Sequence, residues 1–357
     1  MKKEFVSLIL IASTFLFWGC KKGNVVTSDN WDLSGKIVFN VGYYNIYLLD
    51  LSSSSLFLTT LATGGEPRVN PQGTSIVYDA NSTKGHLEIY SISVTGGTAT
   101  DLSNNNAPNS DSWPDWSPDG NTIAFNRVYY PSYKEALCVM GKDGSNLHVL
   151  TDTSSLAIAV MPRWSPDGNK IAFYGQTSFN PSTDYSLYIM APDGSHQVLL
   201  DQVGSDFVDV LPRWSPDGQK IAYGKANGGL YVFNVNSSAS QEITLDSGTA
   251  VSPSGFSWLS NDSLVCANMN SADTSYGVYL ISISHSFANK LLFNEFKTIP
   301  TTGVSPDKKF ISVFGQRTDD TSLTLYIIQS DGTNLRKLKD TGLTGSITDN
   351  YYSQWIK

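Results

Sequence analysis

Cysteine is scarce in this sequence, and its scarcity excludes two classes of structure. The chain has three cysteines among 357 residues, and two of them, Cys138 and Cys266, lie in the apolar stretches ALCVM and LVCA. Neither a disulfide framework nor a metal-binding spacing can be built from them. We therefore expect two buried thiols that act as small hydrophobic side chains, and neither a metal nor another cofactor.

Clusters of positive charge are missing as well. The formal net charge is -8, and no run of Lys and Arg interrupts the acidic balance. Since binding to nucleic-acid phosphates needs a clustered cationic face, a nucleic-acid partner is excluded. Charged residues make up only 16% of the chain, whereas Gly (29), Tyr (18) and Trp (8) are plentiful. This composition favours an all-β fold rich in turns.

The N-terminal hydrophobic run is too short to cross a bilayer comfortably. It extends from Phe5 to Trp18 and follows Lys2 and Lys3. A positive start followed by a short apolar run is typical of a secretory signal, so residues 1–19 are predicted to be a signal peptide.

A cysteine follows this run directly. Gly19-Cys20 resembles a bacterial lipobox, so Cys20 is the predicted lipidation site and residues 20–34 the predicted lipidated tether. Acyl chains on Cys20 would anchor the protein stably. Lys21 and Lys22 stand where an aspartate would favour inner-membrane retention, so we expect an exported lipoprotein on the outer membrane, with its side left open. The alternative is an ordinary signal peptide with an incidental cysteine.

One short sequence motif recurs along the chain. W-S-P-D-G is intact in three places and eroded in four, at spacings of 44 to 51 residues. The residues in the tryptophan slot are Val69, Trp116, Trp164, Trp214, Trp258, Val304 and Trp355. Repetition with such a period indicates an array of similar units.

Each repeat predicts four short strands. An alternating strand such as KIAF (170–173) follows the first turn, a second such as LYIM (187–190) follows a variable loop, and a D-G-S turn leads to the last. Four strands per period are typical of a propeller blade. In S-P-D-G, Pro and Gly fit the turn and the Asp is expected to bond the local backbone. Calcium loops are the alternative interpretation, although each turn offers few oxygen ligands.

The two ends of the sequence complement each other. KIVF (36–39), NIYLLDL (45–51) and LFLTTL (56–61) lack a first strand, and the C-terminal SQWI supplies a first strand alone. We therefore predict a single domain over residues 35–357. It is an all-β, seven-bladed β-propeller of four-stranded blades, with the ring closed by pairing of the N- and C-terminal strands.

The motifs W-S-P-D-G-x-x-I-A-[FY], L-Y-[IV]-M and D-G-[ST] resemble the WD40-like (PD40) repeats of the TolB-like propeller family, over nearly all of residues 35–357. The resemblance implies the propeller fold, since the matching residues are turns and core. Members of that family are usually described with six blades behind a small α/β domain, whereas this chain has seven repeats and no room for that domain. The Tol-Pal partners are therefore not carried over.

Loops between the second and third strands, and between blades, vary in length and are rich in aromatic residues. Loops on a rigid scaffold are frequent binding sites, and Tyr and Trp suit protein or sugar partners. The candidate binding face consists of Trp113, Tyr129, Tyr130, Tyr133, Phe207, Tyr351 and Tyr352. The alternative is that these rings pack the loops onto the blades.

Charged residues precede several slot tryptophans. Arg68, Asp115, Arg163 and Arg213 occupy equivalent positions on the innermost strands and form a candidate ring at the channel. The arginines would attract an anion or a carboxylate-bearing partner. Alternatively, they pair with acids such as Asp115, Asp206 and Asp209 and hold neighbouring blades together.

Catalytic signatures are absent from the sequence. It has no G-x-S-x-G, which peptidases with such propellers carry in a second domain. The propellers of oligogalacturonate-lyase-like proteins use histidines around a metal, but the four histidines here fall on different blades, away from the centre. They are His86, His148, His196 and His285.

These observations favour a non-catalytic cell-envelope lipoprotein that acts as a protein-binding or scaffolding propeller. Its expected partner is an envelope protein or peptide, and a glycan is a further option. We expect contact with the membrane only through the lipid, and a monomer. The alternatives are a carbohydrate-binding or polysaccharide-lyase-like propeller, or a purely structural module of a larger complex.

Overall fold

The computed structural model describes residues 35–41, 45–52, 57–105, 109–178, 184–204, 210–245, 248–251, 255–269, 276–285, 289–340 and 353–356. These residues form strands and turns, and no helix in them is long and apolar enough to span a membrane. All strand pairs are antiparallel, as expected for short strands joined by tight turns.

Five sheets have four strands each, and they follow one another along the chain. The first four contain β4 (Gly65–Val69) to β7 (Thr100–Asp101), β8 (Ser110–Trp116) to β11 (His148–Val149), β12 (Ile158–Trp164) to β15 (Val198–Gly204), and β16 (Arg213–Trp214) to β19 (Ala239–Glu242). Their middle strands are β5 (Ser75–Asn81), β6 (Leu87–Ser93), β9 (Thr122–Tyr129), β10 (Lys134–Gly141), β13 (Ile171–Gln176), β14 (Tyr185–Met190), β17 (Lys220–Gly224) and β18 (Leu230–Asn234).

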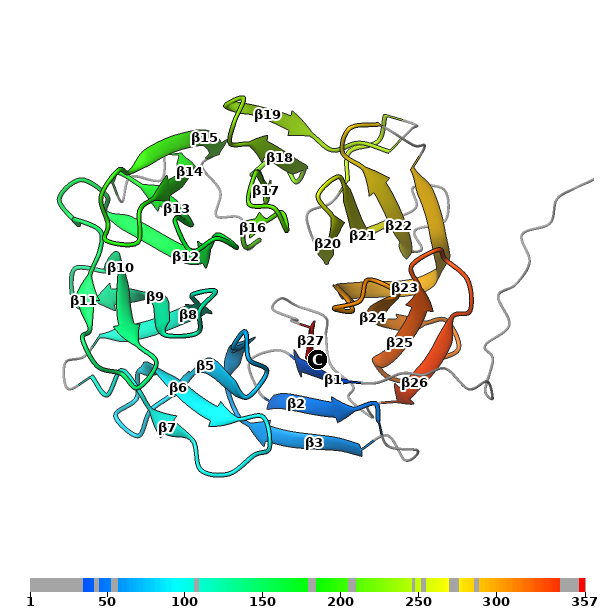
Figure 1. Ribbon diagram of the computed structural model, residues 1–357, viewed down its shortest axis with the longest axis horizontal. Helices are drawn as coiled ribbons and strands as arrows, with labels where there is room; N and C mark the ends of the chain where they lie inside the picture. The colour runs from blue at the N-terminus through cyan, green and yellow to red at the C-terminus, as the bar shows by residue number, and fades with distance from the viewer. Residues whose placement is uncertain are drawn as a thin grey trace, which may run out of the picture.

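The fifth four-stranded sheet joins the two ends of the chain. β27 (Ser353–Ile356) pairs with β1 (Lys36–Val41), which is followed by β2 (Asn45–Asp50) and β3 (Phe57–Ala62). Lys36 lies opposite Ile356, and Ile37 lies opposite Trp355. The C-terminal strand therefore supplies the innermost strand of a sheet whose other strands come from the beginning of the described chain (Figure 1).

A seven-stranded sheet differs from the sequence expectation of separate units. It runs in order from β20 (Phe256–Ser260) to β26 (Arg336–Asp340) through β21 (Ser263–Met269), β22 (Tyr276–Ser282), β23 (Lys290–Val304), β24 (Phe310–Arg317) and β25 (Thr324–Gln329). The outer strand of one predicted unit and the inner strand of the next are here one 15-residue strand, β23. They merge because no turn interrupts this segment.

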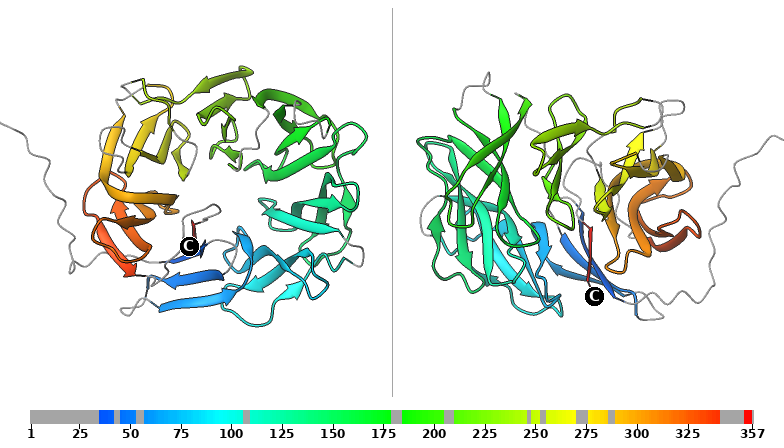
Figure 2. Two further views of the ribbon diagram at one scale, coloured as in Figure 1. Left: turned by 180° about the vertical axis from the view of Figure 1, so that it is seen from behind. Right: turned by 45° about the horizontal axis from the view of Figure 1, so that its top comes forward.

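The sheets are arranged around a common centre, with their first strands innermost and their last strands at the rim (Figure 1). A view from behind and a view tilted by 45° show the same arrangement, with neighbouring sheets standing side by side (Figure 2). Apolar clusters fill the space between neighbours. One such cluster packs Ile37 and Leu49 of the terminal sheet on Phe314 and Leu325, and another packs Val38 on Ile76 of the next sheet.

The S-P-D-G turns have the expected local structure. Asp119 Oδ1 accepts hydrogen bonds from Ser117 Oγ (2.5 Å) and from the Asn121 backbone N–H (3.0 Å). The Ser117 hydroxyl oxygen in turn accepts the Thr122 N–H, at 2.9 Å. Gly120 has φ 71°, a conformation that glycine adopts without strain. The turn aspartate is therefore held by the backbone of its own turn, as predicted.

Candidate functional site

A bulge recurs near the inner end of three neighbouring sheets. Glu66, Trp113 and Met161 each precede a proline and have φ of 44°, 59° and 58°. At each of them the register with the next strand shifts, between Gly65 and Arg68 in the first case. Such a bulge bends the strand and changes where the following side chains point. The repeated X-Pro-[Arg/Asp]-[Trp/Val] sequence was a visible signal for this bulge, but sequence reasoning did not identify it.

The residues after these prolines come together in one pocket of about 360 Å³, which we call the axial pocket. All four predicted channel residues line it. The complete lining is Arg68, Val69, Pro71, Asp115, Trp116, Arg163, Trp164, Pro166, Leu211, Pro212, Arg213, Trp214 and Gln354. The four residues come from the inner strands β4, β8, β12 and β16, and β27 contributes Gln354.

Asp115 lies between two of the arginines. Its Oδ1 is 3.9 Å from Arg68 Nε and 4.0 Å from Arg163 Nη1. Its Oδ2 accepts the backbone N–H of Trp164 at 2.8 Å, which links two sheets. Burial raises the pKa of Asp115, and the Arg163 and Arg68 charges oppose this rise. The predicted pairing of arginine with Asp115 across blades is therefore present, at long range.

Two further acidic residues, Glu66 and Asp79, lie near Arg68. Glu66 Oε2 is 3.4 Å from Arg68 Nη2, and both side chains are buried. Asp79 is also buried and accepts the Trp113 backbone N–H on Oδ2 at 3.1 Å. Burial, followed by the charge of Glu66, raises the pKa of Asp79 to about 7. Sequence reasoning missed both acids, because only the fold places β4 and β8 beside β5.

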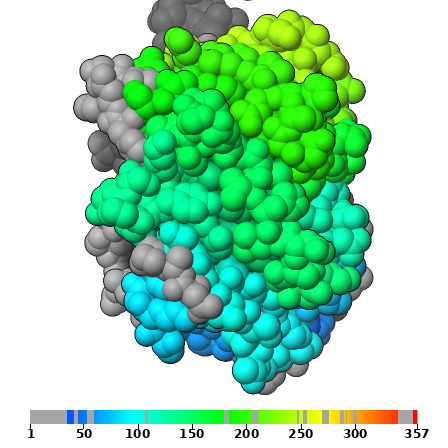
Figure 3. All heavy atoms as spheres, turned by 90° about the vertical axis from the view of Figure 1, so that its left-hand side faces the viewer, coloured from blue at the N-terminus to red at the C-terminus, as the bar shows by residue number. Residues whose placement is uncertain are grey.

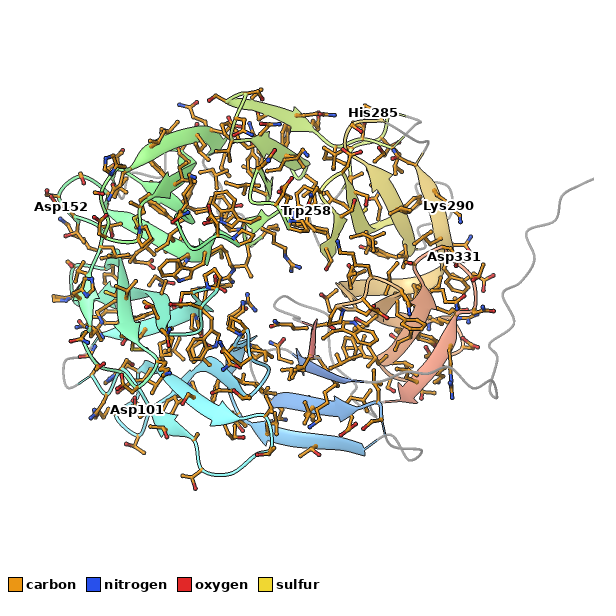
Figure 4. All side chains as sticks on the ribbon, in the orientation of Figure 1. Asp101, Asp152, Trp258, His285, Lys290 and Asp331 are labelled. Carbon is orange, nitrogen blue, oxygen red and sulfur yellow. The ribbon has the colours of Figure 1, made fainter. Side chains whose placement is uncertain are left out.

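Tryptophan indoles connect the inner strands of successive sheets. The Nε1–H groups of Trp116, Trp214 and Trp258 donate to the carbonyls of Arg68, Arg163 and Arg213, at 3.1, 3.0 and 2.9 Å. Figure 4 places Trp258 on the inner side of the sheets, whereas Asp101, Asp152 and Asp331 lie at the outer rim. The slot tryptophans thus serve as ties between neighbouring sheets.

Trp164 departs from this pattern. Its Nε1 is buried and has no hydrogen-bond partner among the described residues. Arg213, by contrast, is tied to the following sheet: its Nη1 donates to the Phe256 carbonyl at 2.7 Å, and its guanidinium lies 5.0 Å from the Phe256 ring centroid.

The variable loops carry a second candidate site. Tyr130 and Tyr133 are 40% and 62% exposed, and their rings meet edge to face at 5.2 Å. Next to them is a pocket of about 330 Å³, lined by Tyr129, Ser132, Lys134, Val149, Thr151, Asp152 and Thr153. We call the two tyrosines and this lining the tyrosine patch. It belongs to the sheet β8–β11, on the side of the molecule seen in Figure 3.

The other predicted face residues are placed differently. Tyr129 is half-buried in the wall of that pocket, and burial raises its pKa to about 12. Trp113 lies within β8 and not in a loop; it is half-buried, and its ring packs on the apolar cluster that joins β12–β15 to β16–β18. The remaining predictions lie outside the described residues: the signal peptide 1–19, the tether 20–34, Cys20, Asp206, Phe207, Asp209, Tyr351 and Tyr352.

In the described ranges, histidine and carboxylate groups do not converge on a metal site. His86 Nε2 lies 3.1 Å from Glu88 Oε1, and His148 and His196 are exposed near outer strands. Figure 4 shows His285 at the rim. Within the part of the chain that the structure describes, no three such groups lie close enough to hold an ion.

Comparisons with known proteins agree on the fold. A family model described as the TolB beta propeller domain matches residues 126–348. The structure of TolB from Acinetobacter baumannii is similar at a TM-score of 0.50 and 15% identity, covering 89% of this chain and 81% of TolB. An oligogalacturonate lyase from Vibrio parahaemolyticus reaches 0.60 at 12% identity and covers 89% of both chains.

A peptidase gives a third comparison. A puromycin-hydrolysing peptidase from Mycobacterium tuberculosis reaches a TM-score of 0.62 at 12% identity. The match covers 85% of this chain but only 50% of the peptidase. At these identities, the similarity shows a shared fold alone.

Proposed function

This chain belongs to the TolB β-propeller domain family, and we propose that it is a non-catalytic propeller of the bacterial cell envelope that binds a protein or peptide partner. The tyrosine patch carries this proposal. Exposed aromatic side chains offer a large contact area with little entropy to lose, and they are enriched at protein interfaces. The patch also combines apolar contact with a lysine and an aspartate at its edge.

We infer a ring of seven blades closed by the chain ends. Counting the seven-stranded sheet as two units that share β23 gives seven units in all. The pairing of β27 with β1 supports the closure, as do the apolar clusters on both sides of that sheet. A rigid ring suits a scaffold, since its loops are presented from fixed positions.

We further propose that the protein is exported and anchored to the outer membrane through Cys20, with residues 20–34 as a tether. The short apolar run before Gly19-Cys20 supports this proposal. Labelling cells with an alkyne-tagged fatty acid should mark the protein, and Cys20→Ser should abolish the label and release the protein from membranes. Equal labelling of the Cys20→Ser variant would refute the anchor.

Pull-down from envelope extracts tests the binding function. Tyr130→Ala/Tyr133→Ala should lose the captured partner. A matched control is Val198→Ala/Leu199→Ala, which removes side chains of similar exposure from the outer strand β15. Undiminished capture by the tyrosine variant, or equal loss in the control, would count against the tyrosine patch.

Carbohydrate binding is the second candidate function, and one observation favours it. The pocket beside Tyr129 combines an aromatic wall with Ser132, Thr151 and Asp152, a mixture that suits a sugar ring and its hydroxyls. A glycan array would identify such a ligand, and Tyr129→Ala should abolish its binding. An assay for unsaturated sugars separates binding from lyase activity, and turnover would overturn the non-catalytic proposal.

A further inference from the structure

We propose that the axial pocket binds the carboxylate group of an anionic ligand. The proposal is independent of the tyrosine patch, which lies in a different part of the sheet β8–β11. Among the residues that line the pocket, Arg68, Arg163 and Arg213 bring three guanidinium groups and Asp115 brings one carboxylate. The lining therefore has an excess of positive charge in a protein whose net charge is -8.

Two acids oppose this charge: Glu66 pairs with Arg68 at 3.4 Å from outside the lining, and the second acid is Asp115. Its distances of 3.9 and 4.0 Å to Arg68 and Arg163 are longer than a direct hydrogen bond. Its other oxygen is held by the Trp164 backbone N–H at 2.8 Å. Asp115 thus holds two arginines near each other by charge without a direct bond to either. Guanidinium groups in that position match the planar fork of a carboxylate.

The indole of Trp164 gives an independent indication of a missing acceptor. Trp116, Trp214 and Trp258 all donate Nε1–H to a carbonyl of the preceding sheet. Trp164 lines the axial pocket, and its buried Nε1 has no acceptor among the described residues. An unpaired buried donor destabilises the folded protein, and an acceptor oxygen would remove this destabilisation. A ligand oxygen bound beside Trp164 would complete the pattern.

The size and walls of the pocket restrict the rest of the ligand. A volume of about 360 Å³ lies at the small end of ligand sites. The exposed Pro71 and Pro166, with the edges of Trp116 and Trp214, give it partly apolar walls. A compact body of one or two rings or residues fits this space. The carboxylate is the shared chemistry, and it can belong to a sugar acid or to the C-terminus of a peptide.

Paired probes test the proposal by isothermal titration calorimetry on the purified protein. Glucuronate is compared with glucose, and N-acetyl-Ala-Ala with its C-terminal amide, so that each pair differs in the carboxylate alone. We expect at least one acid to bind about tenfold more tightly than its neutral counterpart. The pair that shows the difference identifies the source. Equal binding of acid and neutral probes, or no binding of any probe at about 1 mM, would overturn the proposal.

Variants locate the binding site. Arg163→Gln and Arg213→Gln should each weaken the preferred acid by about tenfold or more. Lys142→Gln, which removes an exposed positive charge outside the pocket, should leave binding unchanged. Trp164→Phe keeps the ring but removes the N–H, and it should weaken binding severalfold. Circular dichroism and the melting temperature identify any variant that fails to fold. Full binding by folded Arg163→Gln and Arg213→Gln would exclude the axial pocket.

Discussion

At the scale of single residues, the W-S-P-D-G repeats show which residue types the turn requires. Gly120, Gly168 and Gly218 close the turns with φ between 69° and 74°. In the degenerate copy Val304-Ser-Pro-Asp-Lys308, the same position is occupied by Lys308, at φ 61°. A non-glycine residue pays about 1–2 kcal/mol for this conformation. The turn that contains Lys308 is therefore held in this conformation by its surroundings, at a local energetic cost.

Lys308→Gly should relieve this strain. We expect the free energy of unfolding to rise by about 1 kcal/mol, and the melting temperature by roughly 2 °C. Lys308 is exposed, so little packing is lost. Gly218→Lys is the matched reversal and should lower stability by a similar amount. If both variants moved stability in the same direction, the backbone explanation would be wrong.

Asp79 makes stability depend on pH. Its pKa of about 7 in the folded protein lies above the usual 3.8, so the folded state keeps a proton that the unfolded state has released. Stability therefore falls as the pH rises from about 4 to about 7. In Asp79→Asn this fall should be shallower in melting curves taken across that range. It should not vanish, because burial also raises the pKa of Glu135 to about 7.

Asp119→Asn is the control for this experiment. Hydrogen bonds from Ser117 and Asn121 lower the pKa of Asp119, so its contribution is lost only as the pH falls below the usual range. Between pH 5 and 8 its variant should retain the slope of the parent protein. A slope in Asp79→Asn identical to that of the parent protein would refute the role of Asp79.

Some residues of the axial pocket could be predicted from the sequence, whereas the acids beside them could not. Equivalent positions before the slot tryptophans predicted a channel ring of Arg68, Asp115, Arg163 and Arg213, and the structure places these four side chains in the lining of one pocket. The neighbouring acids Glu66 and Asp79 were not predictable, because they meet across strands that the sequence does not align. The missing acceptor of the Trp164 indole N–H was not predictable either, because the sequence gives all the slot tryptophans equivalent positions.

At the scale of elements, the D-G-S turns at Gly144 and Gly194 contact the backbone of the preceding sheet. A Cβ added to Gly194 would lie 2.5 Å from the Leu150 carbonyl oxygen, and one added to Gly144 would lie 2.4 Å from that of Leu102. These turns therefore touch the backbone of the preceding sheet. The sequence predicted a turn here, but the close approach of another sheet could not be read from it.

Gly194→Ala should cost more than a comparable glycine elsewhere. Gly85 has nearly the same φ, 84° against 83°, but a Cβ there meets nothing within 4 Å. Gly85→Ala should therefore cost only the backbone strain of about 1 kcal/mol. Gly194→Ala should cost about 1–3 kcal/mol more, because the backbone must move. Equal losses in chemical denaturation would show that the sheets do not touch at this turn.

The terminal sheet tests ring closure. Removing residues 354–357 takes away Trp355 and Ile356, which are buried in clusters on either side of the sheet. We expect a fall in melting temperature of several degrees or more, since each buried side chain contributes about 1.5–3 kcal/mol. Removing the predicted tether 20–34 should leave the melting temperature unchanged. A truncated chain that melted with the parent protein would contradict closure by β27.

At the scale of the whole molecule, the inferred ring makes the sheets depend on one another. Each four-stranded sheet buries its apolar faces against its neighbours, whereas the seven-stranded sheet also encloses an apolar cluster of its own. Burial raises the pKa of the Cys138 thiol to about 12 and that of the Cys266 thiol further. Both thiols are therefore protonated and shielded from reagents while the protein is folded.

Thiol reactivity measures whether the ring opens as a unit. Cys138 lies in β10 and Cys266 in β21, on different sheets. In a Cys20→Ser background, both should become reactive to a thiol reagent at the same urea concentration, because a cooperative ring has no stable part. Mass spectrometry of each cysteine peptide reports the two sites separately. Well-separated midpoints would indicate blades that unfold one by one.

The single strand β23 has a consequence for how this gene can change. Elsewhere a turn or loop lies between one sheet and the next, and an inserted residue can be accommodated there by a longer loop. β23 contains no turn, and its 15 residues pair with β22 along one end and β24 along the other. Its register already shifts twice against each partner, so this strand holds its surplus residues as bulges. An additional residue must form a further bulge, because otherwise it would reverse inside and outside for one of the two partners. Natural length variation among descendants of this sequence should therefore be rarer in residues 290–304 than in the turns and loops between the other sheets.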